Sequence, residues 1–116
     1  MAGKELVIEI ETLPGGVVIH PIGEVDMARS PTLRAKLIEA ARTAPQPERL
    51  IVDLTHVPHM DSSGVATLVE ALQKANRGGP RLVLCGMVPR VRSIFEISRL
   101  LGVFSVTATR AEAQES

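Results

Sequence analysis

A short polar segment between two apolar segments holds the residues best suited to chemistry in this sequence. It is His59–Gly64, HMDSSG, which sets an acid and two hydroxyls directly before a helix-like pattern. Asp and Ser oxygens can cap a helix, because they accept hydrogen bonds from the free N–H groups of its first turn. A serine here is also a candidate nucleophile, or a candidate acceptor of a phosphate that adds negative charge. The segment therefore predicts three alternative roles.

Nucleophilic catalysis by Ser62 or Ser63 would require a base within hydrogen-bond reach and N–H donors for an oxyanion. His59 and Asp61 lie nearby in the sequence, but the segment does not match the G-x-S-x-G elbow. A short chain with an aliphatic core also leaves little room for a substrate cleft. A small serine hydrolase is kept as an alternative, and we do not predict an enzyme.

The cap and an outward-facing serine are expected to be different residues. Ser63 lies closer to the helix, so its oxygen is the better placed to reach the first turn, and we expect Ser63 to be the cap. Ser62 is then expected to project freely. The apolar face of the helix begins at Val65 and the helix ends near Asn76.

No metal or cofactor is predicted. His56 and His59 are three residues apart, but Pro58 places them in a loop and no second ligand pair follows at a zinc-like spacing, so solvated loop histidines are expected. Neither of the common glycine-rich phosphate-binding motifs is present. Cys85, the single cysteine, is expected to be a small buried strand residue.

Length and composition predict one globular domain. The chain has 116 residues, of which 45% are hydrophobic and 22% charged. Thirteen Lys and Arg balance thirteen Asp and Glu, so binding to nucleic acid or to an anionic membrane is not predicted. No apolar run has the length of a signal-peptide core or of a membrane span, so we expect a cytoplasmic protein without membrane insertion.

The apolar patterns predict an α/β fold: a mixed, mostly parallel sheet that opens with a hairpin and is packed by about four helices. Ser30 and Pro31 are expected to start the first helix as cap and first-turn proline. The ordered core is expected over about residues 4–110, followed by a short C-terminal tail that is frayed or helical. The expected strands are Lys4–Thr12, Gly15–Gly23, Arg49–Leu54, Pro80–Gly86 and Val103–Thr109, and the first and third helices are expected at about Pro31–Ala44 and Val88–Gly102.

Taken together, these segments resemble the anti-sigma factor antagonists of the STAS domain family over nearly the whole chain. The specific part is Asp-Ser-Ser-Gly placed directly after a strand and loop and before a helix. IGEVDMARSPTLR is similar to the family's turn into its first helix, and LVLCGMVPRVRSIFEISRLLGVF is similar to its closing strand, helix and strand.

The resemblance implies that Ser62 is phosphorylated by a partner that is both a serine kinase and an anti-sigma factor. It implies that Asp61, Ser63 and Gly64 flank Ser62 in the partner-binding surface. Because glycine has no side chain, we also expect Gly64 to let a kinase backbone come close. A second loop with Gly23, Glu24 and Asp26 is implied to touch the same partner. The unphosphorylated form would bind the kinase and free the sigma factor, and a serine phosphatase would reset the protein.

A second interpretation within the same family is a scaffold subunit of a lipid-transport ABC system or of a signalling assembly. The Asp-Ser-Ser-Gly motif would then act as an interaction surface and a cap without phosphorylation. No oligomeric state is predicted.

Overall fold

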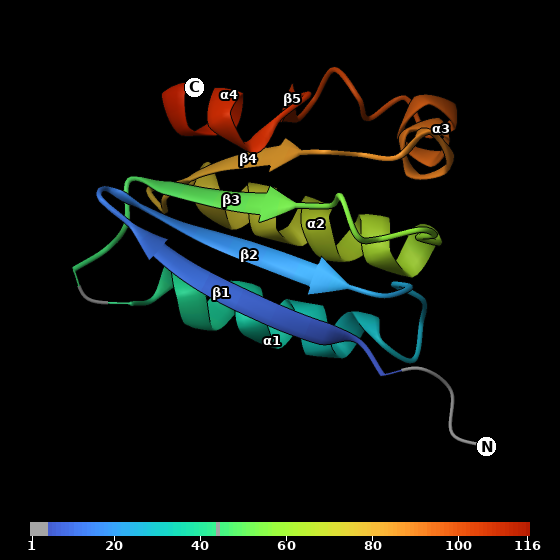
Figure 1. Ribbon diagram of the computed structural model, residues 1–116, viewed down its shortest axis with the longest axis horizontal. Coiled ribbons are helices and arrows are strands. Elements are labelled where there is room, and N and C mark those ends of the chain that lie inside the picture. Colours follow the sequence, from blue (N-terminus) through green and yellow to red (C-terminus); the bar gives the residue numbers. More distant parts are fainter. Residues whose placement is uncertain (1–4, 44) are drawn as a thin grey trace.

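A five-stranded mixed sheet forms the centre of the computed structural model, which describes residues 5–43 and 45–116 (Figure 1). The strands lie in the order in which they occur along the chain. β1 is antiparallel to β2, and every other pair of neighbours is parallel. The strands are β1 (Val7–Leu13), β2 (Gly16–Ile22), β3 (Arg49–Asp53), β4 (Arg81–Cys85) and β5 (Ser105–Thr107).

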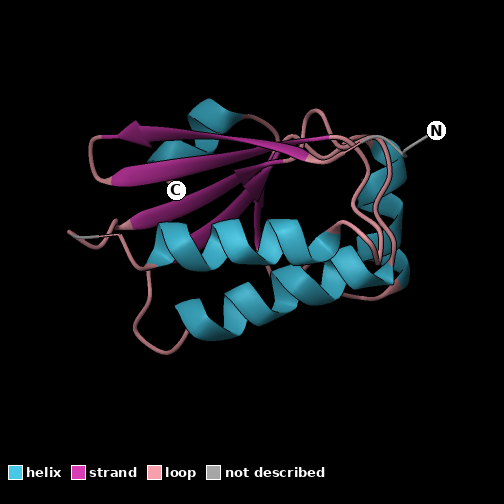
Figure 2. Cartoon of the chain, turned by 90° about the horizontal axis from the view of Figure 1, so that it is seen from below, coloured by secondary structure: helices cyan, strands magenta, loops and turns pink. Residues whose placement is uncertain are grey.

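The helices lie on both faces and at one end of the sheet. Figure 2 shows α1 and α2 side by side under one face and α4 on the opposite face. In Figure 1, α3 lies at the end toward which β2, β3 and β4 point. The bounds are α1 (Ser30–Ala41), α2 (Ser62–Ala75), α3 (Pro89–Ile97) and α4 (Arg110–Glu115). The expected α/β fold with a hairpin and four helices is confirmed.

The strand residues alternate between two apolar layers, because successive side chains point to opposite faces of a sheet. One layer packs under α1 and α2 and includes Ile19, Val52 and Leu84. The other packs under α4 and includes Ile51 and Val83. Burial on both faces accounts for the continuous apolar runs in β3 and β4, which are typical of parallel strands.

The ends of the elements differ slightly from the sequence-based prediction. α1 stops at Ala41, and Ala44, the expected end, lies outside the described residues, as does Lys4 at the expected start of the hairpin. The C-terminal segment is helical rather than frayed. Thr109 and Glu112 form a capping box there, and Ala113 is fully buried against the sheet.

Candidate functional site

Two loops at the carboxyl end of the sheet are joined into one unit. The β2–α1 loop (residues 23–29) and the β3–α2 loop (residues 54–61) exchange three backbone hydrogen bonds. Gly23 N–H donates to the His56 carbonyl at 3.0 Å, Val25 N–H to the His59 carbonyl at 3.0 Å, and Asp61 N–H to the Val25 carbonyl at 3.1 Å. We call these two segments the joined loops. They lead directly into α1 and α2, so the sequence-predicted site residues lie on one scaffold.

Asp61 caps α2. Its carboxylate oxygen accepts hydrogen bonds from the backbone N–H groups of Ser63 at 2.8 Å and Gly64 at 3.4 Å. The expectation that Ser63 is the cap is therefore wrong. Asp61 has the extended backbone that is typical of a cap residue, and its own N–H pairs with the Val25 carbonyl. Ser63 already lies inside the first turn of α2.

Ser62 is the exposed hydroxyl of the motif. It is the first residue of α2, and its side chain makes no hydrogen bond to any part of the chain that the structure describes. Ser63 is half-buried, and its carbonyl accepts a hydrogen bond from the Thr67 hydroxyl at 3.0 Å. The expectation that Ser62 projects freely agrees with this placement.

Gly64 faces inward. A Cβ atom at this position would lie 2.5 Å from Met60 Cγ and 2.9 Å from Val25 Cγ1, and both of those side chains are buried. The absent side chain therefore makes room for the protein's own core. Room for the backbone of a kinase is not what this glycine provides, and its place in the partner-binding surface stays a prediction.

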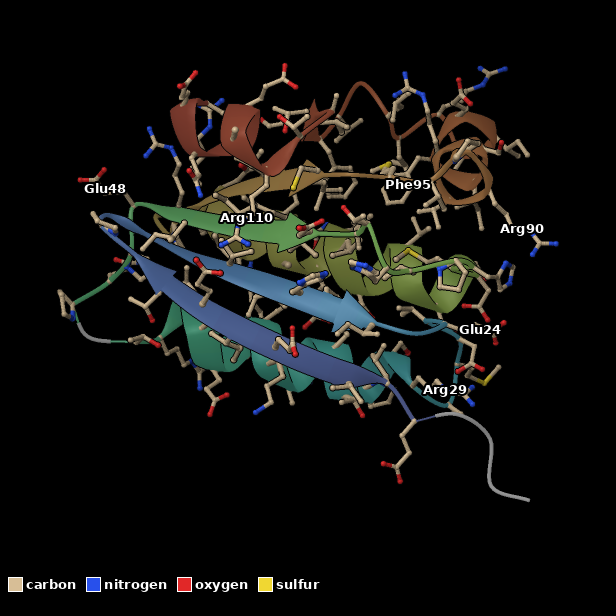
Figure 3. All side chains as sticks on the ribbon, viewed as in Figure 1. Glu24, Arg29, Glu48, Arg90, Phe95 and Arg110 are labelled. Carbon is tan, nitrogen blue, oxygen red and sulfur yellow. The ribbon has the colours of Figure 1, made fainter. Side chains whose placement is uncertain are left out.

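The β2–α1 loop holds the other predicted contact residues. Gly23 has φ +127°, a conformation that residues with a Cβ rarely adopt. Glu24 is exposed (Figure 3). The Asp26 carboxylate accepts the Arg29 backbone N–H at 2.9 Å and pairs with the Arg29 guanidinium. Asp26 therefore shapes the turn into α1.

Ser30 does not cap α1, contrary to the sequence-based expectation. The helix already includes Ser30, and its N-cap is Arg29, which makes no side-chain cap hydrogen bond. Asp26, four residues earlier, supplies a side-chain acceptor near this helix end instead.

His56 of the joined loops meets His20 of β2, which lies 36 residues earlier in the sequence. His20 Nε2 of β2 and His56 Nδ1 lie 2.8 Å apart, and His20 Nδ1 lies 4.0 Å from a Glu9 carboxylate oxygen of β1. His56 is an exposed loop residue, as expected, and it also contacts His20. In residues 5–43 and 45–116 no group of three or more His, Cys, Asp or Glu side chains is arranged to hold a metal ion.

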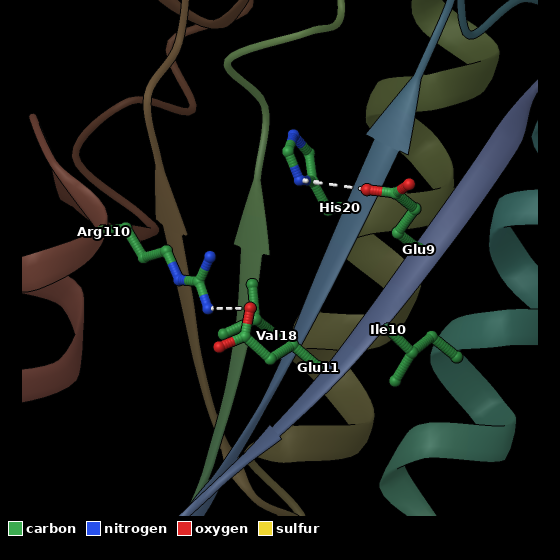
Figure 4. A pocket seen from close by; sticks show the side chains of 6 residues that line it. All are labelled: Glu9, Ile10, Glu11, Val18, His20 and Arg110. Atoms are coloured by element: carbon green, nitrogen blue, oxygen red, sulfur yellow. Dashed lines mark ion pairs between the residues drawn. The ribbon is translucent and has the colours of Figure 1, made fainter.

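An open cavity of about 500 Å³ lies beside this histidine pair, between the hairpin and α4. Figure 4 shows Glu11 and Arg110 paired across Val18, with Glu9 and His20 at the other side. The hydrogen bond between Glu11 and Arg110 lowers the pKa of the carboxyl and raises the pKa of the guanidinium. Ser62 and Ser63 do not line this cavity.

The carboxylate of the motif that could help to activate a serine is engaged in other contacts. The Asp61 carboxylate is occupied by the helix N–H groups, and neither serine hydroxyl donates to a base within the described ranges.

Cys85 is fully buried, and burial, together with the charge of Asp53, raises the pKa of its thiol to about 12. The expected buried strand cysteine is confirmed. No described helix is both long and apolar enough to cross a membrane.

Comparisons with known proteins agree on one family. The STAS domain model matches residues 7–113. The anti-sigma-B factor antagonist of Listeria monocytogenes is 30% identical over 96 residues, which are 81% of each chain. The structure of a Bacillus cell fate determinant in its phosphorylated form aligns with a TM-score of 0.70 and 27% identity, over 94% of this chain and 97% of that one. An anti-sigma factor antagonist from Mycobacterium paratuberculosis has the same fold, with a TM-score of 0.85 at 22% identity over 96% and 92% of the two chains.

Proposed function

Because the chain belongs to the STAS domain family, we propose that it is an anti-sigma factor antagonist that is switched by phosphorylation. In this proposal the unphosphorylated form binds an anti-sigma factor that is also a serine kinase, and so releases the sigma factor. Phosphorylation of Ser62 prevents that binding, and a serine phosphatase restores it. Gly23, Glu24, Asp26, Asp61, Ser63 and Gly64 are proposed to form or support the surface around Ser62.

The observation that carries this proposal is the division of roles within the motif. Asp61 and Gly64 hold the start of α2 in place, one by capping and one by close packing. Ser62 is exposed and takes part in neither. A phosphate on Ser62 would therefore change the surface without removing a contact that supports the fold.

The Asp61 cap would also influence the position of a phosphate on Ser62. A phosphoserine adds about −1.5 to −2 charges, which a helix N-terminus favours through its dipole. Asp61 already holds the N–H groups of Ser63 and Gly64, so they are not available to the phosphate. Repulsion from the Asp61 carboxylate would direct the phosphate outward, where a phosphatase has access to it.

At an interface the same charge is unfavourable. A phosphate covered by a partner loses solvation, and a misplaced buried charge costs about 2–5 kcal/mol, which corresponds to roughly 30- to several-thousand-fold in affinity. Binding is then lost while the fold is kept, which is what a reversible switch requires.

The test is phosphorylation and binding with purified proteins. The anti-sigma factor kinases of the source organism are each incubated with this protein and ATP, and the phosphate is located by mass spectrometry. We expect phosphate on Ser62, a Ser62→Ala variant that binds the kinase but is not phosphorylated, and a Ser62→Asp variant that binds poorly.

Ser63→Ala is the matched control, because it removes the neighbouring hydroxyl and should still be phosphorylated. Phosphate on Ser63 alone, or a Ser62→Asp variant that binds like the unmodified protein, would contradict the proposal. Absence of phosphate on a protein that binds an ATPase subunit of a transporter would favour the scaffold alternative.

A further inference from the structure

Three chain connections lie at the carboxyl end of the sheet: the two joined loops and the connection between β4 and α3. β2, β3 and β4 are parallel neighbours, so the segments that follow them leave the same edge in the same order. The third connection is residues 86–88, which lead from β4 into α3.

The third connection packs tightly against the start of the β3–α2 loop, which leads to Ser62 at the beginning of α2. Gly86 has φ +72°, and a Cβ atom there would lie 2.2 Å from Thr55 Oγ1 and 2.9 Å from Asp53 Oδ1. The Leu54 N–H also donates to the Cys85 carbonyl at 2.8 Å. These contacts pack the start of the β4–α3 connection closely against the start of the β3–α2 loop, and α3 begins three residues after Gly86.

Opposite charges lie on the two connections that flank the β3–α2 loop in the order of the sheet. Glu24 is exposed on the β2–α1 loop and Arg90 is exposed in the first turn of α3. Figure 3 shows both at the same end of the molecule, with Arg90 projecting from α3. Neither side chain makes an ion pair or a hydrogen bond within residues 5–43 and 45–116.

Two other carboxylates of the joined loops and the start of α2 are already engaged. Asp26 pairs with Arg29, and the Asp61 carboxylate holds the helix N–H groups. Within the described residues Glu24 leaves a negative charge without an ion pair on the β2–α1 loop, and Arg90, with Arg92 further along α3, leaves positive charge without one on α3.

We propose that the first turn of α3 belongs to the partner-binding surface, and that Glu24 and Arg90 together set the orientation in which the anti-sigma factor kinase docks. This inference rests on the proposed function. The kinase would present a cationic group to Glu24 and an acidic group to Arg90. Charges at the rim of an interface act mainly by steering the encounter and excluding wrong orientations, so their loss should lower the association rate more than it raises the dissociation rate.

The experiment compares Arg90→Glu with Arg77→Glu. Arg77 is also exposed and makes no side-chain ion pair within the described ranges, but it follows the far end of the 14-residue α2, about 20 Å from Ser62. Both variants undergo the same change of charge. Association and dissociation rates with the kinase that phosphorylates the unmodified protein are measured at two salt concentrations, and circular dichroism shows that both variants are folded.

We expect Arg90→Glu to lower the association rate about tenfold, with a smaller difference at high salt, and Arg77→Glu to leave it unchanged. Glu24→Arg should lower it by a similar factor. If the unmodified protein is bound and phosphorylated while Arg90→Glu behaves like Arg77→Glu, this inference is wrong and the proposed function stands. If no kinase binds the unmodified protein, the proposed function fails, and this inference fails with it.

Discussion

The Asp61 carboxylate accepts a hydrogen bond from the Ser63 backbone N–H at 2.8 Å. The same residue donates its own N–H to the Val25 carbonyl at 3.1 Å and so joins the two loops. Asp61 thus begins α2 and fixes its position relative to the β2–α1 loop. A substitution here should affect the stability of the fold as well as binding.

Removing the cap should destabilise the protein measurably. Asp61→Ala leaves the Ser63 and Gly64 N–H groups without their side-chain acceptor, and we expect the free energy of unfolding to fall by about 1 kcal/mol. Asp61→Asn keeps an oxygen acceptor and should cost much less. Urea unfolding at neutral pH measures both. Ser63→Ala is the control, and a loss for Ser63→Ala as large as that for Asp61→Ala would contradict the assignment of the cap.

Gly64→Ala should also destabilise the fold, although alanine is the better helix former. The gain in helix propensity is at most about 1 kcal/mol, whereas overpacking a core typically costs about 1–3 kcal/mol. Met60 and Val25 are both fully buried and have little freedom to move away from the added methyl group. We expect a net loss of about 1–2 kcal/mol in urea unfolding.

Gly102→Ala is the matched control for Gly64→Ala. A Cβ atom at Gly102 would meet no heavy atom within 4 Å. Its effect should stay within about 0.5 kcal/mol. Equal effects at the two glycines would show that close packing is not the reason for glycine in the motif.

A negative charge at Ser62 should leave the fold intact. The side chain is exposed and lies at the positive end of the α2 dipole, which stabilises a negative charge. The neighbouring Asp61 carboxylate repels that charge, so the two effects oppose each other. We expect Ser62→Asp to change the free energy of unfolding by less than about 1 kcal/mol. Thermal unfolding of Ser62→Asp and Ser62→Asn, which differ in charge and not in size, measures it. A loss of cooperative unfolding in Ser62→Asp would mean that the charge acts on the fold.

The buried thiol of Cys85 should make stability fall in alkaline solution. Burial raises its pKa to about 12, whereas an unfolded thiol ionises near pH 8.5. Above about pH 9 the unfolded chain releases this proton and the folded chain retains it. The free energy of unfolding should therefore fall by up to about 1.4 kcal/mol per pH unit until about pH 12.

Cys85→Ala is the control for this pH dependence, because it removes the ionising group at a buried position. Its free energy of unfolding should decline less steeply above pH 9 than that of the unmodified protein. At pH 8 the native thiol should be inert to a disulfide reagent and should react once the chain is unfolded. Parallel pH profiles for the two proteins would contradict the assignment.

The order of strands and helices was predictable because it depends on local patterns. The apolar run of β3 and the i, i+3, i+4, i+7 spacing after Val65 each indicate one element without knowledge of its neighbours. The cap was not predictable in the same way. Asp61, Ser62 and Ser63 all carry suitable oxygens, and the pairing of Asp61 with Val25, 36 residues earlier, decides between them.

Contacts between distant segments account for the other differences. From the sequence, Gly64 was expected to admit a kinase backbone, and only the fold shows that Met60 and Val25 occupy the space beside it. His56 meets His20 across 36 positions of sequence, and no local pattern of either residue predicts this contact. The neighbourhood of Arg90 follows from the parallel arrangement of β2, β3 and β4.

The three backbone hydrogen bonds of the joined loops mean that the cost of ordering this surface is met when the chain folds. A loop that became ordered only on binding would lose about 1–2 kcal/mol of conformational entropy per residue at each encounter. In the proposed cycle a kinase and a phosphatase would instead meet the same rigid shape in turn. The two forms of the protein would then differ in charge and not in conformation.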